Sequence, residues 1–224
     1  MKLSPYLKYF WFITRHWNPR LAMFTVIKEM RGEKKYGIQT MPVDDLKRLN
    51  VEGENKEHAS IYQGANYFLL EKAFDFLKEA GASGDLVDFG SGKGRIMVVA
   101  AHYGFQQITG IDFAPALCNA GRKNIGNIKL NFPNVIFNII CEDAVNYIVG
   151  NNDNVFFFFN PFDEKIMLLV VKNILKSFKE NPREIYVIYI NPMDKEIFLS
   201  AGFEEEFYIE KLTYLEMSIL TLRQ

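Results

Sequence analysis

The segment of this chain best suited to chemistry is a glycine-rich turn, Val87-Asp88-Phe89-Gly90-Ser91-Gly92-Lys93-Gly94-Arg95. It follows a short apolar run and precedes a stretch of helical character, so it is expected to join a buried strand to a helix. Its three glycines let the backbone N–H groups and the N-terminus of the helix approach a ligand closely. The turn therefore indicates a site for a nucleotide-like ligand, with Gly90, Gly92 and Gly94 in the backbone cradle.

Two common nucleotide-binding patterns can be compared with this turn. A phosphate-binding loop requires a glycine five residues before Gly92, where the chain has Val87, and Ser or Thr after Lys93, where it has Gly94. That pattern is excluded. The dinucleotide fingerprint places its third glycine three residues after the second, at the position of Arg95. An NAD-type oxidoreductase therefore fits less well but stays open as an alternative.

Polar residues follow each of the next apolar runs. Asp112 lies 22 residues after Gly90, Glu142-Asp143 follows the third run, and Asn160-Pro161-Phe162 follows the fourth. In an open parallel sheet, ligands bind beyond the carboxyl ends of the strands, at the point where the strand order reverses. We therefore expect these residues to gather with Asp88 around one crevice.

The Asp-x-Gly-x-Gly-x-Gly turn and the polar residues after it resemble the motifs of class I S-adenosylmethionine-dependent methyltransferases of bacterial type, over residues 60–224. The resemblance implies S-adenosylmethionine as the cofactor. It also implies that Asp112 hydrogen-bonds both ribose hydroxyls and that Asp143 contacts the adenine amino group. Asp88 would organise the turn and bind the methionine amino group, and Phe113 would keep water away from the cofactor.

Asn160-Pro161-Phe162 is similar to the family's Asn/Asp-Pro-Pro-aromatic motif, which lies beside the transferred methyl group. The chain has one proline where that motif has two, so the acceptor stays open between a protein amino group and a small molecule. Asn160 is the candidate for orienting the acceptor, and Pro161, Phe162 and Tyr62 are candidates for its pocket. Two alternatives remain: Glu142 in place of Asp143, and Asn160 as an ordinary turn residue before proline.

The elements that must position these residues alternate along the chain. Helices are expected near 65–79, 93–103, 115–126, 163–179 and 194–201. Apolar runs that predict strands lie at 86–89, 108–113, 135–140, 155–159, 185–190, 203–209 and 212–222. This order predicts an α/β fold with a Rossmann-like, seven-stranded and mostly parallel sheet. The last two strands are joined so closely that they must form an antiparallel hairpin.

The first part of the chain, residues 1–60, is predicted to be a helical and irregular extension before a cofactor-binding domain at 61–224. Ser4-Pro5 and Asn18-Pro19 suit helix starts and predict helices over 5–17 and 19–31. In the second helix, Phe24, Ile27 and Met30 recur at helical spacing. Glycines and charges over 32–60 predict a linker or lid.

The charge is uneven, because residues 1–50 hold ten Lys and Arg against four Asp and Glu, and the remainder carries a net charge of −7. Basic and aromatic residues together suit a membrane surface or nucleic acid. They equally suit packing on the acidic body, above the cofactor site, which we favour.

The composition limits the classes of protein to which the chain can belong. With 49% hydrophobic and 24% charged residues and a net charge of −1, the chain reads as an ordinary globular protein. No apolar stretch reaches the roughly 18 residues that a membrane span requires. Two cysteines and three histidines cannot supply a usual zinc cluster, so we expect no metal and a reducing, cytoplasmic location. A non-catalytic nucleotide-binding or targeting module is the second alternative to the methyltransferase.

Overall fold

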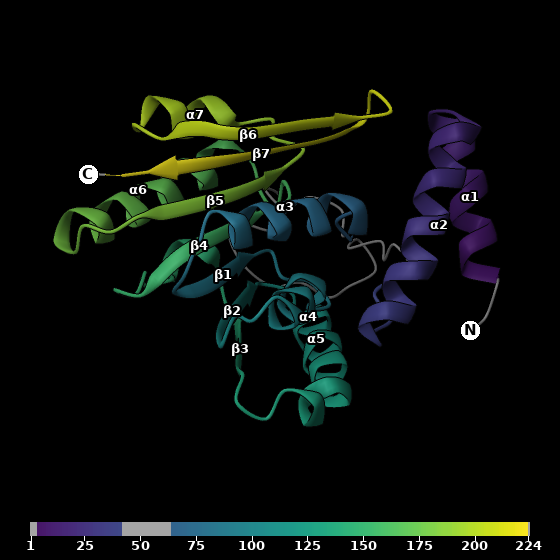
Figure 1. Cartoon of the computed structure of the whole chain (residues 1–224), viewed down its shortest axis with the longest axis horizontal. Coiled ribbons are helices and arrows are strands. Elements are labelled where there is room, and N and C mark those ends of the chain that lie inside the picture. The colour runs from purple at the N-terminus through teal and green to yellow at the C-terminus, as the bar shows by residue number, and fades with distance from the viewer. Residues whose placement is uncertain (1–3, 42–63, 224) are drawn as a thin grey trace.

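Seven strands run through the centre of the molecule in the order β3-β2-β1-β4-β5-β7-β6 (Figure 1). The computed structural model describes residues 4–41 and 64–223. The strands are β1 (Asp85–Phe89), β2 (Gln107–Asp112), β3 (Ile136–Cys141), β4 (Asp153–Phe158), β5 (Ile185–Ile190), β6 (Glu204–Lys211) and β7 (Leu215–Leu222). Strands β1 to β5 pair in parallel, and β7 lies antiparallel between β5 and β6. The predicted Rossmann-like sheet and its C-terminal hairpin are confirmed.

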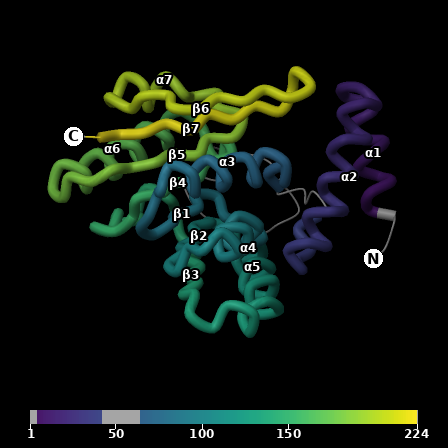
Figure 2. Tube along the Cα trace, viewed as in Figure 1, coloured from purple at the N-terminus to yellow at the C-terminus, as the bar shows by residue number. Residues whose placement is uncertain are grey.

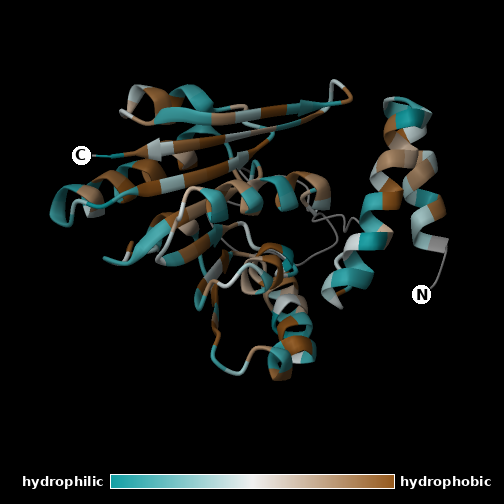
Figure 3. Ribbon diagram, viewed as in Figure 1, coloured by the Kyte–Doolittle hydropathy of each residue, from teal (hydrophilic) through white to brown (hydrophobic). Residues whose placement is uncertain are grey.

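Helices cover both faces of the sheet. They are α1 (Ser4–His16), α2 (Pro19–Tyr36), α3 (Tyr67–Glu79), α4 (Arg95–His102), α5 (Pro115–Ile128), α6 (Glu164–Glu180) and α7 (Lys195–Ser200), with single turns η3 (Lys129–Asn131) and η4 (Ala144–Asn146). Leu86 of β1 packs in a core with α3, α4 and α5, whereas Val87 and Phe89 pack in a second core with α6 and α7. Because both faces are buried, the central strands are apolar on both sides, and Figure 3 shows hydrophobic colour along much of β5.

Strand β1 lies at the point where the strand order reverses. Its neighbours are β2 on one side and β4 on the other, and Asp88 is in register with Gly110 and with Phe157. The chain leaves β2 toward one edge of the sheet and leaves β4 toward the other. A crevice outside the carboxyl ends of β1 and β4 is where ligands of such sheets bind.

The second helix is longer than the sequence pattern predicts. α2 extends past 31 to Tyr36 and ends at Gly37, whose φ of 69° is left-handed and whose N–H donates to the Glu33 carbonyl at 3.0 Å. Gly32 therefore lies inside the helix, and the prediction of a linker or lid over 32–60 is wrong for residues 32–36. Its lack of a side chain has a packing cause, since a Cβ there would lie 2.2 Å from the Tyr67 ring.

The hairpin of α1 and α2 stands on the side toward which β5 and β6 run (Figures 1 and 2). Ile13, Leu21 and Ala22 form a small core there, and Leu212 and Leu215 at the β6–β7 turn pack against it. The predicted linker at 42–60 and the predicted domain boundary at residue 60 lie outside the described residues, so both stay predictions.

A substitution at Gly32 tests whether the Tyr67 ring fixes the hairpin to the domain. Gly32→Ala is expected to lower the free energy of unfolding by about 1–3 kcal/mol, because the added methyl overpacks a closed contact. The matched control is Gly126→Ala in α5, where a Cβ would meet nothing within 4 Å. Helix propensity predicts a gain of up to about 1 kcal/mol there. Urea denaturation of both variants checks this, and equal stabilisation by both would contradict the packing.

Candidate functional site

The glycine-rich turn requires its glycines. Gly90, Gly92 and Gly94 have φ values of 79°, 52° and 77°, which are left-handed and favour glycine. The N–H groups of Gly90 and Ser91 both donate to the Ile111 carbonyl at 2.9 Å, which ties the turn to β2. The turn thus folds across the end of β2 and delivers the chain into α4.

Asp112, at the end of β2, holds this turn directly. Its Oδ2 accepts from the Gly92 N–H at 2.8 Å, and its Oδ1 accepts from the Ala114 N–H at 2.9 Å. Burial raises the pKa of Asp112, while these two N–H bonds act in the opposite direction. Each carboxylate oxygen has a further lone pair that can accept from a ligand hydroxyl. The next residue, Phe113, is half-buried.

Asp88 is the most unusual side chain of the site. Its carboxyl group is buried, and neither oxygen has a hydrogen-bond partner among the described residues. Burial raises its pKa well above the ordinary value, and the negative charge of Asp112 raises it further. Buried polar groups are normally paired. An unpaired carboxyl group beneath a glycine turn therefore fits a ligand that brings a positively charged donor.

Two more polar atoms of the site are buried without a hydrogen-bond partner among the described residues: the hydroxyl of Ser91 and Oδ1 of Asn160. Asn160 follows β4 and has a left-handed φ of 39°, which few residues other than glycine adopt. Asn191, which also precedes a proline, has a φ of 51°, so this conformation also suits the ordinary turn residue that the sequence leaves open as an alternative. Together with Asp88, these two groups offer a ligand several hydrogen-bond acceptors and one hydroxyl donor.

The loop after β4 touches the glycine turn. Pro161 lies against Gly90 so closely that a Cβ on Gly90 would come within 2.5 Å of the proline Cβ. Phe162 is half-buried, and its ring meets the Phe158 ring edge-on with centroids 6.3 Å apart. The structure thus brings the first and fourth predicted motifs together at the carboxyl ends of β1 and β4.

The remaining predicted residues of the site are Asp143, its alternative Glu142, and Tyr62. Asp143 is half-buried and begins η4, where its Oδ1 accepts from the Val145 N–H at 3.1 Å, whereas Glu142 is exposed. This arrangement favours Asp143 over Glu142, but its adenine contact stays a prediction. Tyr62 lies outside the described residues. Within those residues, no group of three or more His, Cys, Asp and Glu side chains could hold a metal ion.

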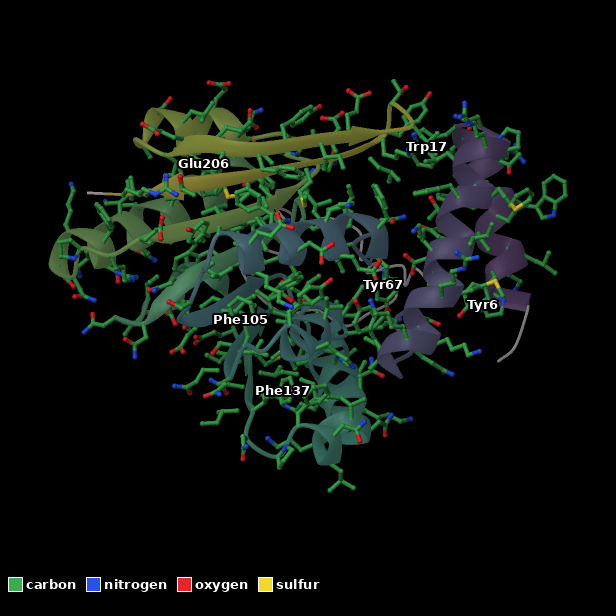
Figure 4. All side chains as sticks on the ribbon, in the orientation of Figure 1. Tyr6, Trp17, Tyr67, Phe105, Phe137 and Glu206 are labelled. Atoms are coloured by element: carbon green, nitrogen blue, oxygen red, sulfur yellow. The ribbon has the colours of Figure 1, made fainter. Side chains whose placement is uncertain are left out.

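Arg95, the first residue of α4, has a role that its local sequence does not indicate. Its guanidinium is buried and pairs bidentately with Glu29 of α2, at 2.9 and 2.7 Å. It also donates to the Ala65 carbonyl at 2.6 Å and to the Thr40 hydroxyl at 2.8 Å. The guanidinium carbon lies 4.3 Å from the centre of the Tyr67 ring, which Figure 4 labels between α3 and the hairpin.

A second carboxylate of α2 is buried beside this pair. Glu33 accepts from the hydroxyl of Tyr6 and from the N–H groups of Thr40 and Met41, the last two at 2.7 and 2.9 Å. In the sequence, Glu29 and Glu33 lie one helical turn apart, which was the available signal of a buried polar cluster. No residue near them in sequence identifies Arg95 as the partner. The N-terminal hairpin is therefore attached to the glycine turn through buried polar contacts.

Helix α5 supports the turn from another side. The side-chain amide of Asn124 donates to the carbonyls of Lys93 and Gln39, at 2.9 and 3.3 Å. The backbone of Gly121 is close to the turn as well, since a Cβ on Gly94 would lie 3.6 Å from the Gly121 Cα. Asn124 thus joins the turn to the segment that follows α2.

Solved structures with known names share this fold. Over 72% of this chain and 81% of the other, it is similar to the ribosomal protein L11 methylase of Lactobacillus delbrueckii subsp. bulgaricus, at 15% identity and a TM-score of 0.54. The magnesium protoporphyrin IX methyltransferase of Synechocystis PCC 6803 with bound SAM matches at 12% identity, a TM-score of 0.53 and coverages of 73% and 87%.

A third match is the tRNA (uracil-54, C5)-methyltransferase of Pyrococcus abyssi in complex with S-adenosyl-L-homocysteine, at 16% identity and a TM-score of 0.51, covering 72% of this chain and 40% of that one. Neither a family model nor a curated protein matches the chain. At these identities the likeness shows the class I methyltransferase fold.

The unpaired Asp88 predicts a specific dependence of stability on pH. Its pKa is higher in the folded chain than the ordinary 3.8, so above that pH the folded protein holds a proton that the unfolded chain releases. The free energy of unfolding must therefore fall as the pH rises through the raised pKa. Asp88→Asn removes this contribution, and we expect the variant to be more stable than the parent at neutral pH.

Urea denaturation at several pH values from mildly acidic to neutral checks this. The matched control Glu142→Gln changes an exposed carboxyl group and is expected to follow the parent curve. A parent and an Asp88→Asn variant with parallel pH profiles would show that the Asp88 carboxyl is not held in an unfavourable buried site.

Proposed function

We propose that this chain is an S-adenosylmethionine-dependent methyltransferase whose cofactor binds at the crevice between β1 and β4. The observation that carries the proposal is the buried, unpaired carboxyl group of Asp88 beneath a turn of three left-handed glycines. The methionine part of this cofactor ends in an ammonium group, which would satisfy that carboxylate. The fold and the names of the similar structures, two of them crystallised with SAM or S-adenosyl-L-homocysteine, support the same cofactor.

Each predicted residue then has a part in binding. Asp112 accepts hydrogen bonds from the ribose hydroxyls with the lone pairs that its backbone contacts leave available. Asp143 reads the adenine amino group from the loop after β3, and Phe113 excludes water on the same side. Gly90, Gly92 and Gly94 bring the backbone and the N-terminus of α4 close to the ligand.

The cofactor supplies a methyl group activated by a sulfonium. The chain's task is to hold an acceptor lone pair in line with that methyl group, and proximity and orientation can supply roughly 7–11 kcal/mol of the barrier. The buried side-chain oxygen of Asn160, which has no partner among the described residues, and its left-handed backbone support this role. Pro161 and Phe162 form the wall next to it. The acceptor can be a protein amino group or a small molecule.

Isothermal titration calorimetry tests the cofactor. We expect S-adenosylhomocysteine to bind with a micromolar dissociation constant, equivalent to about −8 kcal/mol, and NADH to bind much more weakly. Asp112→Ala should weaken binding roughly 10- to 150-fold, because hydrogen bonds to a charged acceptor contribute about 1.5–3 kcal/mol. The matched control Glu142→Ala alters an exposed acid and should retain full affinity. Preference for NADH would favour the oxidoreductase alternative instead.

Asn160→Ala separates binding from chemistry. We expect this variant to keep its affinity for S-adenosylhomocysteine and to transfer the methyl group more slowly, since the side chain acts on the acceptor in the transition state. Transfer is measured with a labelled methyl donor over a panel of amines, peptides and small hydroxylated compounds. A parallel loss of affinity and turnover would move Asn160 into the cofactor shell or into the fold.

A further inference from the structure

The α1–α2 hairpin carries several large apolar side chains that are exposed to solvent. Trp11 is 65% exposed, Leu7 57% and Met23 54%. Together with Phe12 and Ile27, which are also exposed, these three residues form what we call the outer face of the hairpin. Figure 3 shows apolar bands on both helices, and Figure 4 labels Trp17, which is also exposed, at the end of the hairpin nearest the β6–β7 turn. Exposed apolar residues gathered in this way mark an interaction surface.

Among residues 4–41 and 64–223, the contacts that hold the hairpin on the domain come from other side chains than those of the outer face. Ile13, Leu21 and Ala22 pack toward the β6–β7 turn, and Glu29 pairs with Arg95. The outer apolar residues therefore take no part in the contacts that position the hairpin. Their exposure calls for a partner other than this domain.

The charge of the hairpin is divided between its two sides. Its two acidic residues, Glu29 and Glu33, are both buried and bonded on the inner side. Its seven basic residues are exposed or half-buried: Lys8, Arg15, Arg20, Lys28, Arg31, Lys34 and Lys35. Lys28 lies over the Phe68 ring and Lys35 pairs with Glu71, both of α3. The other five basic residues give the exposed side of the hairpin a positive charge.

Apolar and basic residues follow the same ridges of the two helices. On α1, Leu7 and Trp11 are four residues apart. Lys8 is next to Leu7 and three residues before Trp11, and Arg15 is four residues after Trp11. On α2, Met23 and Ile27 lie between Arg20 and Arg31 at the same helical spacing. Such ridges suit an interface that is negatively charged at its surface and apolar just below it.

We propose that the outer face of the hairpin binds an anionic phospholipid surface, with the hairpin lying in the interface plane. Tryptophan prefers the headgroup level, basic side chains are attracted to anionic headgroups, and the aliphatic side chains enter the acyl boundary. None of the helices in the described residues is long and apolar enough to cross a membrane. This inference does not depend on the methyltransferase proposal.

Two other partners fit this face less well. Nucleic acid offers phosphates to the basic residues and bases to the aromatic rings, but it gives no apolar layer for Leu7, Met23 and Ile27. A second copy of the chain would bring two cationic faces together, which is unfavourable. Both become distinguishable outcomes of the experiment below.

Fluorescence provides a direct readout, because Trp11 belongs to the outer face and Trp17, the second of the two tryptophans in the sequence, lies at the end of the same hairpin. The full chain is mixed with phosphatidylcholine vesicles that contain or lack phosphatidylserine. We expect a blue shift of emission and co-sedimentation with the vesicles that contain phosphatidylserine, both reduced by salt. Unchanged emission and no sedimentation at low salt would overturn the proposal.

Matched variants locate the contact. Leu7→Glu combined with Ile27→Glu should weaken partitioning by about tenfold or more. Leu130→Glu combined with Ile148→Glu, at positions 94% and 89% exposed on the main domain, should leave it unchanged. Replacing Arg15 or Arg20 with Gln should weaken partitioning about fivefold for each arginine. Circular dichroism verifies that every variant is folded.

Three results would contradict the proposal. The first is partitioning that the Leu7→Glu/Ile27→Glu pair does not alter. The second is a concentration-dependent dimer that this pair abolishes in a chain without affinity for vesicles. The third is tight binding to single-stranded RNA with no response to vesicles.

Discussion

The buried guanidinium of Arg95 fixes how the N-terminal part of the chain meets the glycine turn. A charge in that position must be paired, and it takes partners from α2, from the segment after it and from the residues before α3. Removing Glu29 alone would leave the charge uncompensated, at a cost of about 3–5 kcal/mol. Because Arg95 directly follows Gly94, the same contacts set the position of the turn. The hairpin is therefore part of the framework of the site.

The site itself combines well-supported backbone with side chains that the fold does not satisfy. Asp112, Asn124 and the Ile111 carbonyl hold the glycine turn at several points. In contrast, Asp88 and Asn160 carry buried oxygen atoms without partners in the described residues. A rigid cradle around unsatisfied groups is what a preorganised ligand site requires, because binding then costs little reordering. The fold gives up stability at Asp88 for this purpose.

Much of the fold was predictable from local pattern, because strands covered on both faces appear as apolar runs and a short connection forces an antiparallel hairpin. The position of the glycine turn after β1 and that of Asp112 at the end of β2 were predictable from the spacing of the apolar runs. The inner side of α2 was not: the periodicity of Phe24, Ile27 and Met30 suggested the buried face, yet Ile27 is exposed and Glu29 is buried. The partner of Glu29 lies 66 residues away in sequence, and a long-range ion pair leaves no local signal. Gly32 was misread for the same reason, since the Tyr67 ring that it accommodates belongs to another element.

The central claim is that one ligand satisfies Asp88 and Asp112 together. The most direct measurement is a crystal structure of the chain with S-adenosylhomocysteine. We expect the amino group of the ligand within hydrogen-bond distance of the Asp88 carboxylate and the ribose hydroxyls at Asp112, with the glycine turn unmoved. Ligand bound elsewhere, or bound with Asp88 still unpaired, would contradict it.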